Sequence, residues 1–178
     1  KARESLYFSF PVLLDKKERK ERIIHYIKEL DLDTAHRNQE FLVFNLKKLF
    51  SIIAYFGCKD IELKQLLLDF GWDFHMVNSS FAEIRCELDD IIEDSFLIFS
   101  NENMFTVIKK IKAISSQGYT LEQVYASLGS HGYSVGQIRR FRRIIRESQK
   151  ANNEVLKVQH KKIYHNLKRN TELQSTFS

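Results

Sequence analysis

The chain has 178 residues, of which 43% are apolar, so it can bury a hydrophobic core and is neither a disordered tail nor a disulfide miniprotein. With 6 glycines and 1 proline it lacks the turn residues that a many-stranded barrel or sandwich uses, which favours a mainly α-helical fold. The formal net charge of +5 permits a polyanionic partner without requiring one.

The charge is unevenly distributed along the chain. Residues 30–107 carry 6 lysines and arginines against 14 acidic residues, whereas residues 108–178 carry 14 against 4. We therefore predict three parts: an extended segment and a basic helix at 1–38, an acidic helical core at 39–108, and a basic helical hairpin with a C-terminal helix at 109–178. We expect a polyanion-binding surface in the last part, where like charges reinforce one another.

The first elements of the chain are predicted from caps and hydrophobic spacing. Residues 6–14 form a candidate edge strand, which contains Pro11. A helix follows Asp15, which has capping-box spacing with Glu18. Further helices are expected at 39–56 and 60–70, each followed by a glycine, and a fourth is expected to begin near Asn78 or Ser79.

Two apolar runs after the fourth helix leave the fold class open between two alternatives. Residues 95–100 and 104–108 flank the polar turn 101–103, which predicts a β-hairpin and, after three helices, a winged-helix-like core. Val107, Ile108, Ile111 and Ile114 also satisfy a helical period, which favours a plain helical core instead.

An internal repeat predicts the starts of two helices. The segment 118–124 (GYTLEQV) recurs fourteen residues later as 132–138 (GYSVGQI). Each copy places a hydroxyl residue, Thr120 or Ser134, three residues before a glutamine, which is the spacing of a capping box. We predict a short helix at 120–128, a tight link through Gly129 to Tyr133, and a longer helix from Ser134.

The two helices resemble a helix-turn-helix unit. Gly129 would lie at the turn, Val124 and Leu128 on the packed face of the first helix, and Val135 and Ile138 on that of the second. The motif's usual alanine, four residues before the turn glycine, is replaced here by a tyrosine. The resemblance covers about 25 residues, implies a DNA-binding hairpin and points to no particular family.

Arginines follow one another along the second helix with a single glutamate, Glu147, nearby. Because neighbouring arginines repel one another, an external anion is expected to neutralise them, and guanidinium groups suit phosphate. The candidate nucleic-acid-binding residues are Ser134, Gln137, Arg139, Arg140, Arg142, Arg143, Arg146 and Lys150. Gln137, Arg139 and Arg140 would approach base edges, and Arg142, Arg143 and Arg146 would contact phosphates. Beyond Lys150 the chain stays compatible with a helix to about residue 170.

These features predict a non-enzymatic protein that binds double-stranded DNA, as a regulator or accessory factor and as a homodimer. The alternative is a protein-interaction adaptor with complementary acidic and basic surfaces, since the acidic block 83–94 offers the arginines an internal or intersubunit partner. No glycine-rich phosphate loop, serine elbow or His-Glu-x-x-His array is present, so we expect no catalysis and no cofactor.

The cysteines and the hydrophobic segments indicate where in the cell we expect the protein. Cys58 and Cys86 have no histidine or cysteine at a zinc-ligand spacing, so we expect two buried thiols, no metal site and a reducing cytoplasmic environment. The most hydrophobic stretch, 41–57, is interrupted by Lys47 and Lys48 and is shorter than the roughly 20 residues that cross a bilayer. We therefore expect no contact with a membrane.

Overall fold

The computed structural model describes residues 14–33, 37–96, 102–152 and 169. Of the predicted strand 6–14, residues 6–13 lie outside these residues, and Leu14 is described but belongs to no strand. The predicted continuation of the last helix beyond residue 152 also lies outside them, apart from residue 169, which is helical. The chain divides into two compact units, of which the larger spans Leu14–Arg143 and the other includes the residues from Ile144 onward. The predicted boundaries at 38/39 and 108/109 stay predictions.

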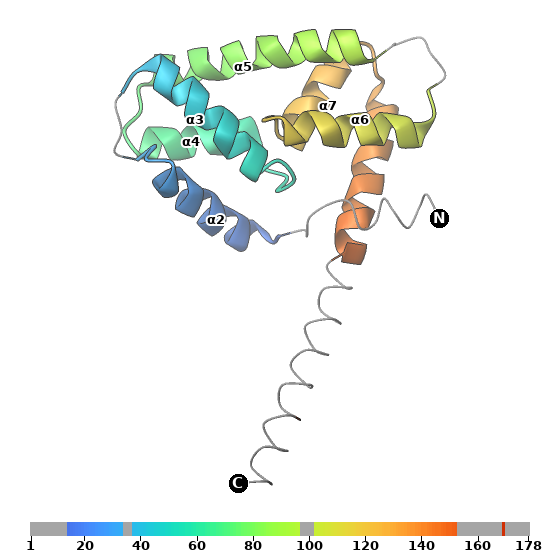
Figure 1. Ribbon diagram of the computed structural model, residues 1–178, viewed down its shortest axis with the longest axis horizontal. Helices are drawn as coiled ribbons and strands as arrows, with labels where there is room; N and C mark the ends of the chain where they lie inside the picture. Colours follow the sequence, from blue (N-terminus) through green and yellow to red (C-terminus); the bar gives the residue numbers. More distant parts are fainter. Residues whose placement is uncertain (1–13, 34–36, 97–101, 153–168, 170–178) are drawn as a thin grey trace. The chain divides into compact units, whose positions relative to one another are not determined.

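The described residues form an all-α structure. The helices are α2 (Lys16–Glu29), α3 (Gln39–Ile52), α4 (Asp60–Asp69), α5 (Phe74–Ser95), α6 (Met104–Ser116) and α7 (Leu121–Ser130). A further helix covers residues 135–152, and we call it the arginine helix (orange in Figure 1). Its residues 135–143 belong to the larger unit. The part of the chain that the structure describes contains no strand.

Short polar side chains determine where most of these helices begin. The carboxylates of Asp15 and Asp73 and the side-chain oxygens of Asn38, Asn103 and Thr120 each accept a hydrogen bond from an amide in the first turn of the helix that follows. Such caps satisfy backbone donors that have no partner inside the helix. Helix α4 begins after Lys59 without a side-chain cap.

Helix α5 is the longest helix of the larger unit and organises its core. It contacts α3 and α4 near its beginning and α7 further along, and α6 packs on both α3 and α7 (Figure 1). Phe50 of α3 meets Phe81 of α5 edge to face, with ring centroids 5.5 Å apart. Ile84 and Leu88 continue the buried stripe of α5 and are almost fully shielded from solvent. An amphipathic helix of this length therefore holds the two ends of the unit together.

The predicted hairpin and winged helix are wrong. Helix α6 occupies residues 104–116, where the second strand was expected, and its cap Asn103 accepts from the Phe105 amide at 2.9 Å. The apolar residues at helical spacing are all buried: Val107, Ile108, Ile111 and Ile114. The segment therefore follows the helical period and not the alternating pattern of a strand. Of the first predicted strand, Ser95 ends α5 and Phe96 caps it, and the remainder lies outside the described residues.

The fourth helix begins earlier than predicted, at Phe74 instead of near Asn78 or Ser79. The carboxylate of Asp73 accepts a hydrogen bond from the Met76 amide at 3.0 Å and supplies the cap. Asp, Asn and Ser are about equally good caps, so the sequence offers three candidate starts, and the helix begins at the first of them.

Glycine is required at the turn between α6 and α7. Gly118 has a φ of +120°, and a Cβ there would lie 3.1 Å from the backbone oxygen of Lys47 in α3. The Leu121 amide donates to the Ala54 oxygen at 2.9 Å and ties the start of α7 to the end of α3. The turn therefore approaches α3 more closely than a side chain allows.

We expect Gly118→Ala to lower the free energy of unfolding by about 1–3 kcal/mol, because both its backbone angle and its contact with Lys47 oppose a Cβ. Gly136→Ala is the matched control, because Gly136 lies in a helix where a Cβ would stand 3.9 Å from the nearest atom, and this change should raise the free energy of unfolding by about 0.5–1 kcal/mol. Urea unfolding followed by circular dichroism measures both changes. Equal effects of the two substitutions would contradict the assignment.

Candidate nucleic-acid interface

The repeated capping box forms at both predicted positions. In the first copy the Gln123 amide donates to the Thr120 hydroxyl at 3.2 Å, and the Thr120 amide donates to the Gln123 side chain at 3.1 Å. In the second copy the Gln137 amide donates to the Ser134 hydroxyl at 3.1 Å, and the Ser134 amide donates to the side-chain oxygen of Gln137 at 2.9 Å. The predicted start of the arginine helix at Ser134 is thereby confirmed.

The hairpin formed by α7 and the beginning of the arginine helix differs in two details from the expected helix-turn-helix pattern. Gly129 lies inside α7, and the turn falls at 131–134, where Gly132 has a φ of +99°. Val135 is 67% exposed and does not pack against α7. A helix that continues to Ser130 moves the turn past Gly129, so the predicted positions at both residues were wrong.

Three residues of the hairpin pack as predicted. Val124 and Leu128 of α7 are fully buried. Ile138 approaches Gly129 so closely that a Cβ on the glycine would lie 3.3 Å from its terminal methyl group. The small residue that allows the two helices to cross is therefore Gly129, even though it does not form the turn.

The arginines of the larger unit divide into one that faces α7 and three that face outward. At about 100° per residue, Ile138 and Arg142 share the side of the arginine helix that meets α7, whereas Arg139, Arg140 and Arg143 fall together on another side. Arg139, Arg140 and Arg143 are exposed, and Arg142 is half-buried. We call these three outward residues the arginine face.

Arg142 is held by the protein itself. One of its terminal nitrogens (Nη1) donates to both oxygens of the Glu122 carboxylate, at 2.8 and 3.1 Å. Its guanidinium also lies over the ring of Tyr125, 4.8 Å from the centroid. Glu122 and Tyr125 both lie on α7, so Arg142 joins the arginine helix to that helix by an ion pair and a cation–π contact. Neither partner was predicted from the sequence, although Tyr125 stands out there in place of the expected alanine.

The arginine face has no such partner. No side-chain hydrogen bond or ion pair joins Arg139, Arg140 or Arg143 to another described residue. Three exposed guanidinium groups on one side of a helix repel one another unless an anion lies between them. Their arrangement therefore favours an external anion.

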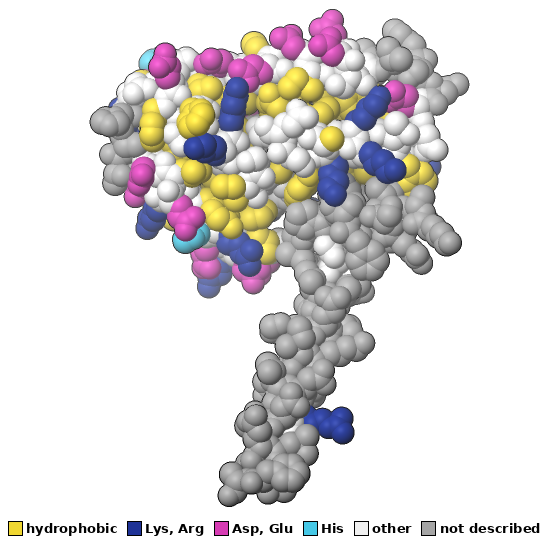
Figure 2. Space-filling model, viewed as in Figure 1, with side chains coloured by type: hydrophobic (Ala, Val, Ile, Leu, Met, Phe, Trp, Pro, Cys, Tyr) yellow, Lys and Arg dark blue, Asp and Glu magenta, His cyan; other side chains and the backbone are white. Residues whose placement is uncertain are grey.

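The acidic block of α5 does not supply that anion within the larger unit. Glu87 pairs with Lys47, and Asp89 accepts from Arg85 at 3.0 Å and from Ser127 at 2.6 Å. Figure 2 shows acidic side chains gathered along the edge of the molecule that α5 forms. Among residues 135–143 of the arginine helix, the internal neutralisation that the sequence left open occurs at Arg142, which pairs with Glu122 of α7.

The remaining predicted site residues lie in both units of the chain. Ser134 and Gln137 are exposed at the start of the arginine helix, and their side chains serve the capping box. Arg146 and Lys150 are exposed and belong to the other unit. The structure thus brings Gln137 and the arginine face together on one short helical segment.

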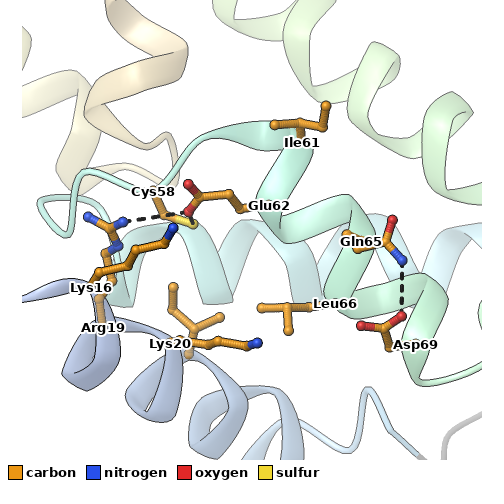
Figure 3. A pocket seen from close by; sticks show the side chains of 10 residues that line it. Lys16, Arg19, Lys20, Cys58, Ile61, Glu62, Gln65, Leu66 and Asp69 are labelled. Atoms are coloured by element: carbon orange, nitrogen blue, oxygen red, sulfur yellow. Dashed lines mark hydrogen bonds and ion pairs between the residues drawn. The ribbon is translucent and has the colours of Figure 1, made fainter.

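A hollow of about 380 Å³ lies between α2 and α4, away from the arginine helix (Figure 3). Four of its polar side chains form two pairs: Arg19 with Glu62 at 3.7 Å, and Gln65 with Asp69 at 3.0 Å. Ile23 and Cys58 are buried below them. Lys16 and Lys20 lie along the α2 side.

The two cysteines differ in exposure, so the prediction of two buried thiols was wrong for Cys86, which is exposed on α5. Cys58 is 1% exposed, and its burial, together with a hydrogen bond from its thiol to Glu62, raises its pKa to about 12. Since the thiolate is the reactive form, Cys58 should be inert in the folded protein.

We expect a thiol reagent such as Ellman's reagent to modify Cys86 at pH 8 within minutes and Cys58 after unfolding in guanidinium chloride. Cys86→Ser should abolish the reaction of the native protein, and Cys58→Ser should leave it unchanged. Rapid reaction of native Cys86→Ser protein would refute the shielded environment of Cys58.

Neither a metal site nor a membrane span emerges from the described ranges. No group of three or more histidine, cysteine, aspartate or glutamate residues in them is placed to hold a metal ion. None of the helices in the same ranges has the length and apolar character needed to cross a bilayer.

Comparison with known proteins gives no relative: no family model, no curated protein and no solved structure matches this chain. Its function is therefore inferred from the chemistry of its own side chains.

We expect Glu122→Gln and Arg142→Met each to destabilise the larger unit, with a coupling of about 1 kcal/mol in a double-mutant cycle, because each change leaves the other group without its partner. Thermal unfolding of the two single variants and the double variant measures the coupling. Arg143→Met, on the exposed side of the same helix, should be nearly neutral. Additive effects at Glu122 and Arg142 would show that their contact contributes nothing.

Proposed function

We propose that this protein binds double-stranded DNA without catalysing a reaction, as a regulator or accessory factor. The observation that carries the proposal is the arginine face: Arg139, Arg140 and Arg143 are exposed, adjacent and without a carboxylate partner among the described residues. Phosphate suits these residues because a planar guanidinium can bond two of its oxygens at once. The backbone of a duplex presents such phosphates at a regular spacing.

The contrast with Arg142 strengthens this proposal. Where the fold supplies an anion, the arginine bonds both of its oxygens and stacks on an aromatic ring. Where it supplies none, the guanidinium groups stay in solvent, which is the arrangement needed for a polyanionic ligand. Arg142 was expected to contact phosphate. Its pairing with Glu122 supports a structural role instead, in which it holds the arginine helix against α7.

The proposed docking places the start of the arginine helix at a DNA groove. Gln137, Arg139 and Arg140 lie in its first two turns and would approach base edges, while Arg143 would contact the backbone. Arg146 and Lys150 would extend the phosphate contacts. Because one short helix buries little DNA surface, we also propose that two copies bind as a dimer.

Duplex binding should depend steeply on salt. We expect the protein to bind a random duplex of about 20 base pairs at about 50 mM salt and to weaken with a log–log slope near −0.9 per phosphate contact. Arg143→Ala should reduce the steepness of that slope by about 0.9, and Arg139→Ala/Arg140→Ala/Arg143→Ala should abolish measurable binding near 150 mM salt. Fluorescence anisotropy measures both effects.

A charge-matched control separates the arginine face from net charge. Lys17→Ala/Arg22→Ala/Lys28→Ala removes three positive charges from exposed positions of α2 and should retain most of the affinity. Circular dichroism should show equal helicity for both triple variants. No binding by the natural chain at about 50 mM salt, or full affinity in the arginine variant, would refute the proposal.

A protein-interaction adaptor is the second candidate, and an observation on α5 favours it. Asp90, Glu93 and Asp94 are exposed at i, i+3 and i+4 and make no ion pair with a described residue. They present an acidic surface separate from the arginine face, as an adaptor with two complementary surfaces requires. Loss of duplex binding together with salt-sensitive self-association would favour this function.

A further inference from the structure

The hollow between α2 and α4 has the size of a small-molecule site. Its volume of about 380 Å³ is near the lower end of the usual range for ligand pockets, about 300–1,000 Å³. Every residue that lines it belongs to the larger unit. Because the hollow lies away from the arginine helix, a ligand bound there would be independent of the proposed DNA binding.

The apolar surface that a ligand would meet in this hollow is aliphatic. Leu66 of α4 lines it, and Ile61 of the same helix, which is 74% exposed, lines it as well (Figure 3). On the α2 side, Lys16 and Lys20 add the methylene groups of their side chains. No aromatic ring of a described residue lines the hollow, so it offers no face on which a planar ring could stack. An aliphatic ligand therefore suits it best.

The carboxylates that line the hollow already have partners. Glu62 pairs with Arg19 at 3.7 Å, and Asp69 accepts a hydrogen bond from Gln65 at 3.0 Å. The first pair places the start of α2 beside the start of α4, whereas Asp69 ends α4, about 10 Å along the axis of that helix from Glu62. An anion held near Lys16 would therefore stay clear of Asp69.

Two cations at the edge of the hollow have no anion. Lys16 and Lys20 are exposed, and no hydrogen bond or ion pair joins either to another described residue. They are one turn apart on α2, so their ammonium groups leave the same side of the helix and repel each other. Within α2 no carboxylate stands three or four positions from either of them. An anion between the two ammonium groups would neutralise this repulsion.

We infer that this hollow binds a small amphiphilic anion, that is, a short aliphatic chain with one anionic headgroup. The chain would lie against Leu66 and Ile61, and the headgroup would lie between the ammonium groups of Lys16 and Lys20. The volume suits a single short chain, so the ligand is a free molecule and not a membrane lipid with two long chains. Alkyl carboxylates and alkyl phosphates share this chemistry, and the first experiment distinguishes them.

The first experiment titrates ¹⁵N-labelled protein with ligands that share one chain and differ in headgroup. Octanoate should shift the amide signals of Lys16, Lys20 and Leu66 saturably at millimolar concentrations. Octanol should bind at least five-fold more weakly, and octylammonium should not bind, because two lysines favour a negative headgroup. Hexanoate should bind about ten-fold more weakly than octanoate, because it buries two fewer CH₂ groups. The tighter ligand of octanoate and octyl phosphate identifies the headgroup.

The second experiment removes the two charges and keeps the chain-binding surface. Lys16→Met/Lys20→Met retains the methylene groups and should bind octanoate no more tightly than octanol. Lys17→Met/Lys28→Met removes two charges from exposed positions of α2 that do not line the hollow, and it should keep the preference for octanoate. Ile61→Ala, at an exposed position, should weaken octanoate and octanol to the same extent, by about three-fold or more.

Three results would overturn the inference. The first is the absence of shifts at Lys16, Lys20 and Leu66 with both octanoate and octyl phosphate. The second is an unchanged preference for octanoate over octanol in Lys16→Met/Lys20→Met. The third is binding to vesicles of an anionic phospholipid without a response to octanoate or octyl phosphate, which would assign the lysines to a membrane surface. None of these results affects the proposed DNA binding, which depends on the arginine face.

Discussion

The rotation of the arginine helix about its own axis determines what this protein can present to a partner. Three contacts within the larger unit fix it: Ile138 against Gly129, Phe141 against Tyr133, and Arg142 on Glu122. Because residues one position apart differ by about 100° around a helix, a small rotation would exchange buried and exposed guanidinium groups. The proposed interface is thus a consequence of apolar packing and one ion pair, and the capping box at Ser134 sets where the helix starts.

The separation of charge seen in the sequence has a physical counterpart in the fold. Two acids of α5 pair with cations: Glu87 with Lys47 of α3, and Asp89 with Arg85 of α5 itself. They therefore do not compete for the arginine face. A polyanion that approached the molecule would meet attraction at the start of the arginine helix and repulsion along α5, so charge alone would orient the encounter.

Local chemistry made much of the fold predictable. The hydroxyl-to-glutamine spacing located the starts of α7 and the arginine helix, and the spacing between Asp15 and Glu18 located α2. Where two local rules competed, the prediction failed: residues 104–108 suit a strand and a helix equally, and the start of α5 depends on a cap, Asp73, that precedes other residues of similar capping strength. Burial of the whole helical stripe of α6 decided the first case.

The candidate site was predictable in composition but not in geometry. Arginine clustering showed which helix to consider, and helical spacing places Arg142 on the side of Ile138, yet nothing local to residues 139–143 shows that a carboxylate lies there. Its partner Glu122 lies 20 residues away on another helix, and their meeting depends on how the two helices cross.

Lys110 has a role that follows from its two bonds. Its ammonium donates to the Ser95 oxygen at the end of α5 and to Glu102 just before α6, at 2.8 and 2.6 Å. A single side chain thus anchors both ends of the connection between these helices. An insertion between positions 96 and 102 would lengthen that connection without removing either bond, so the two helix ends would keep this link.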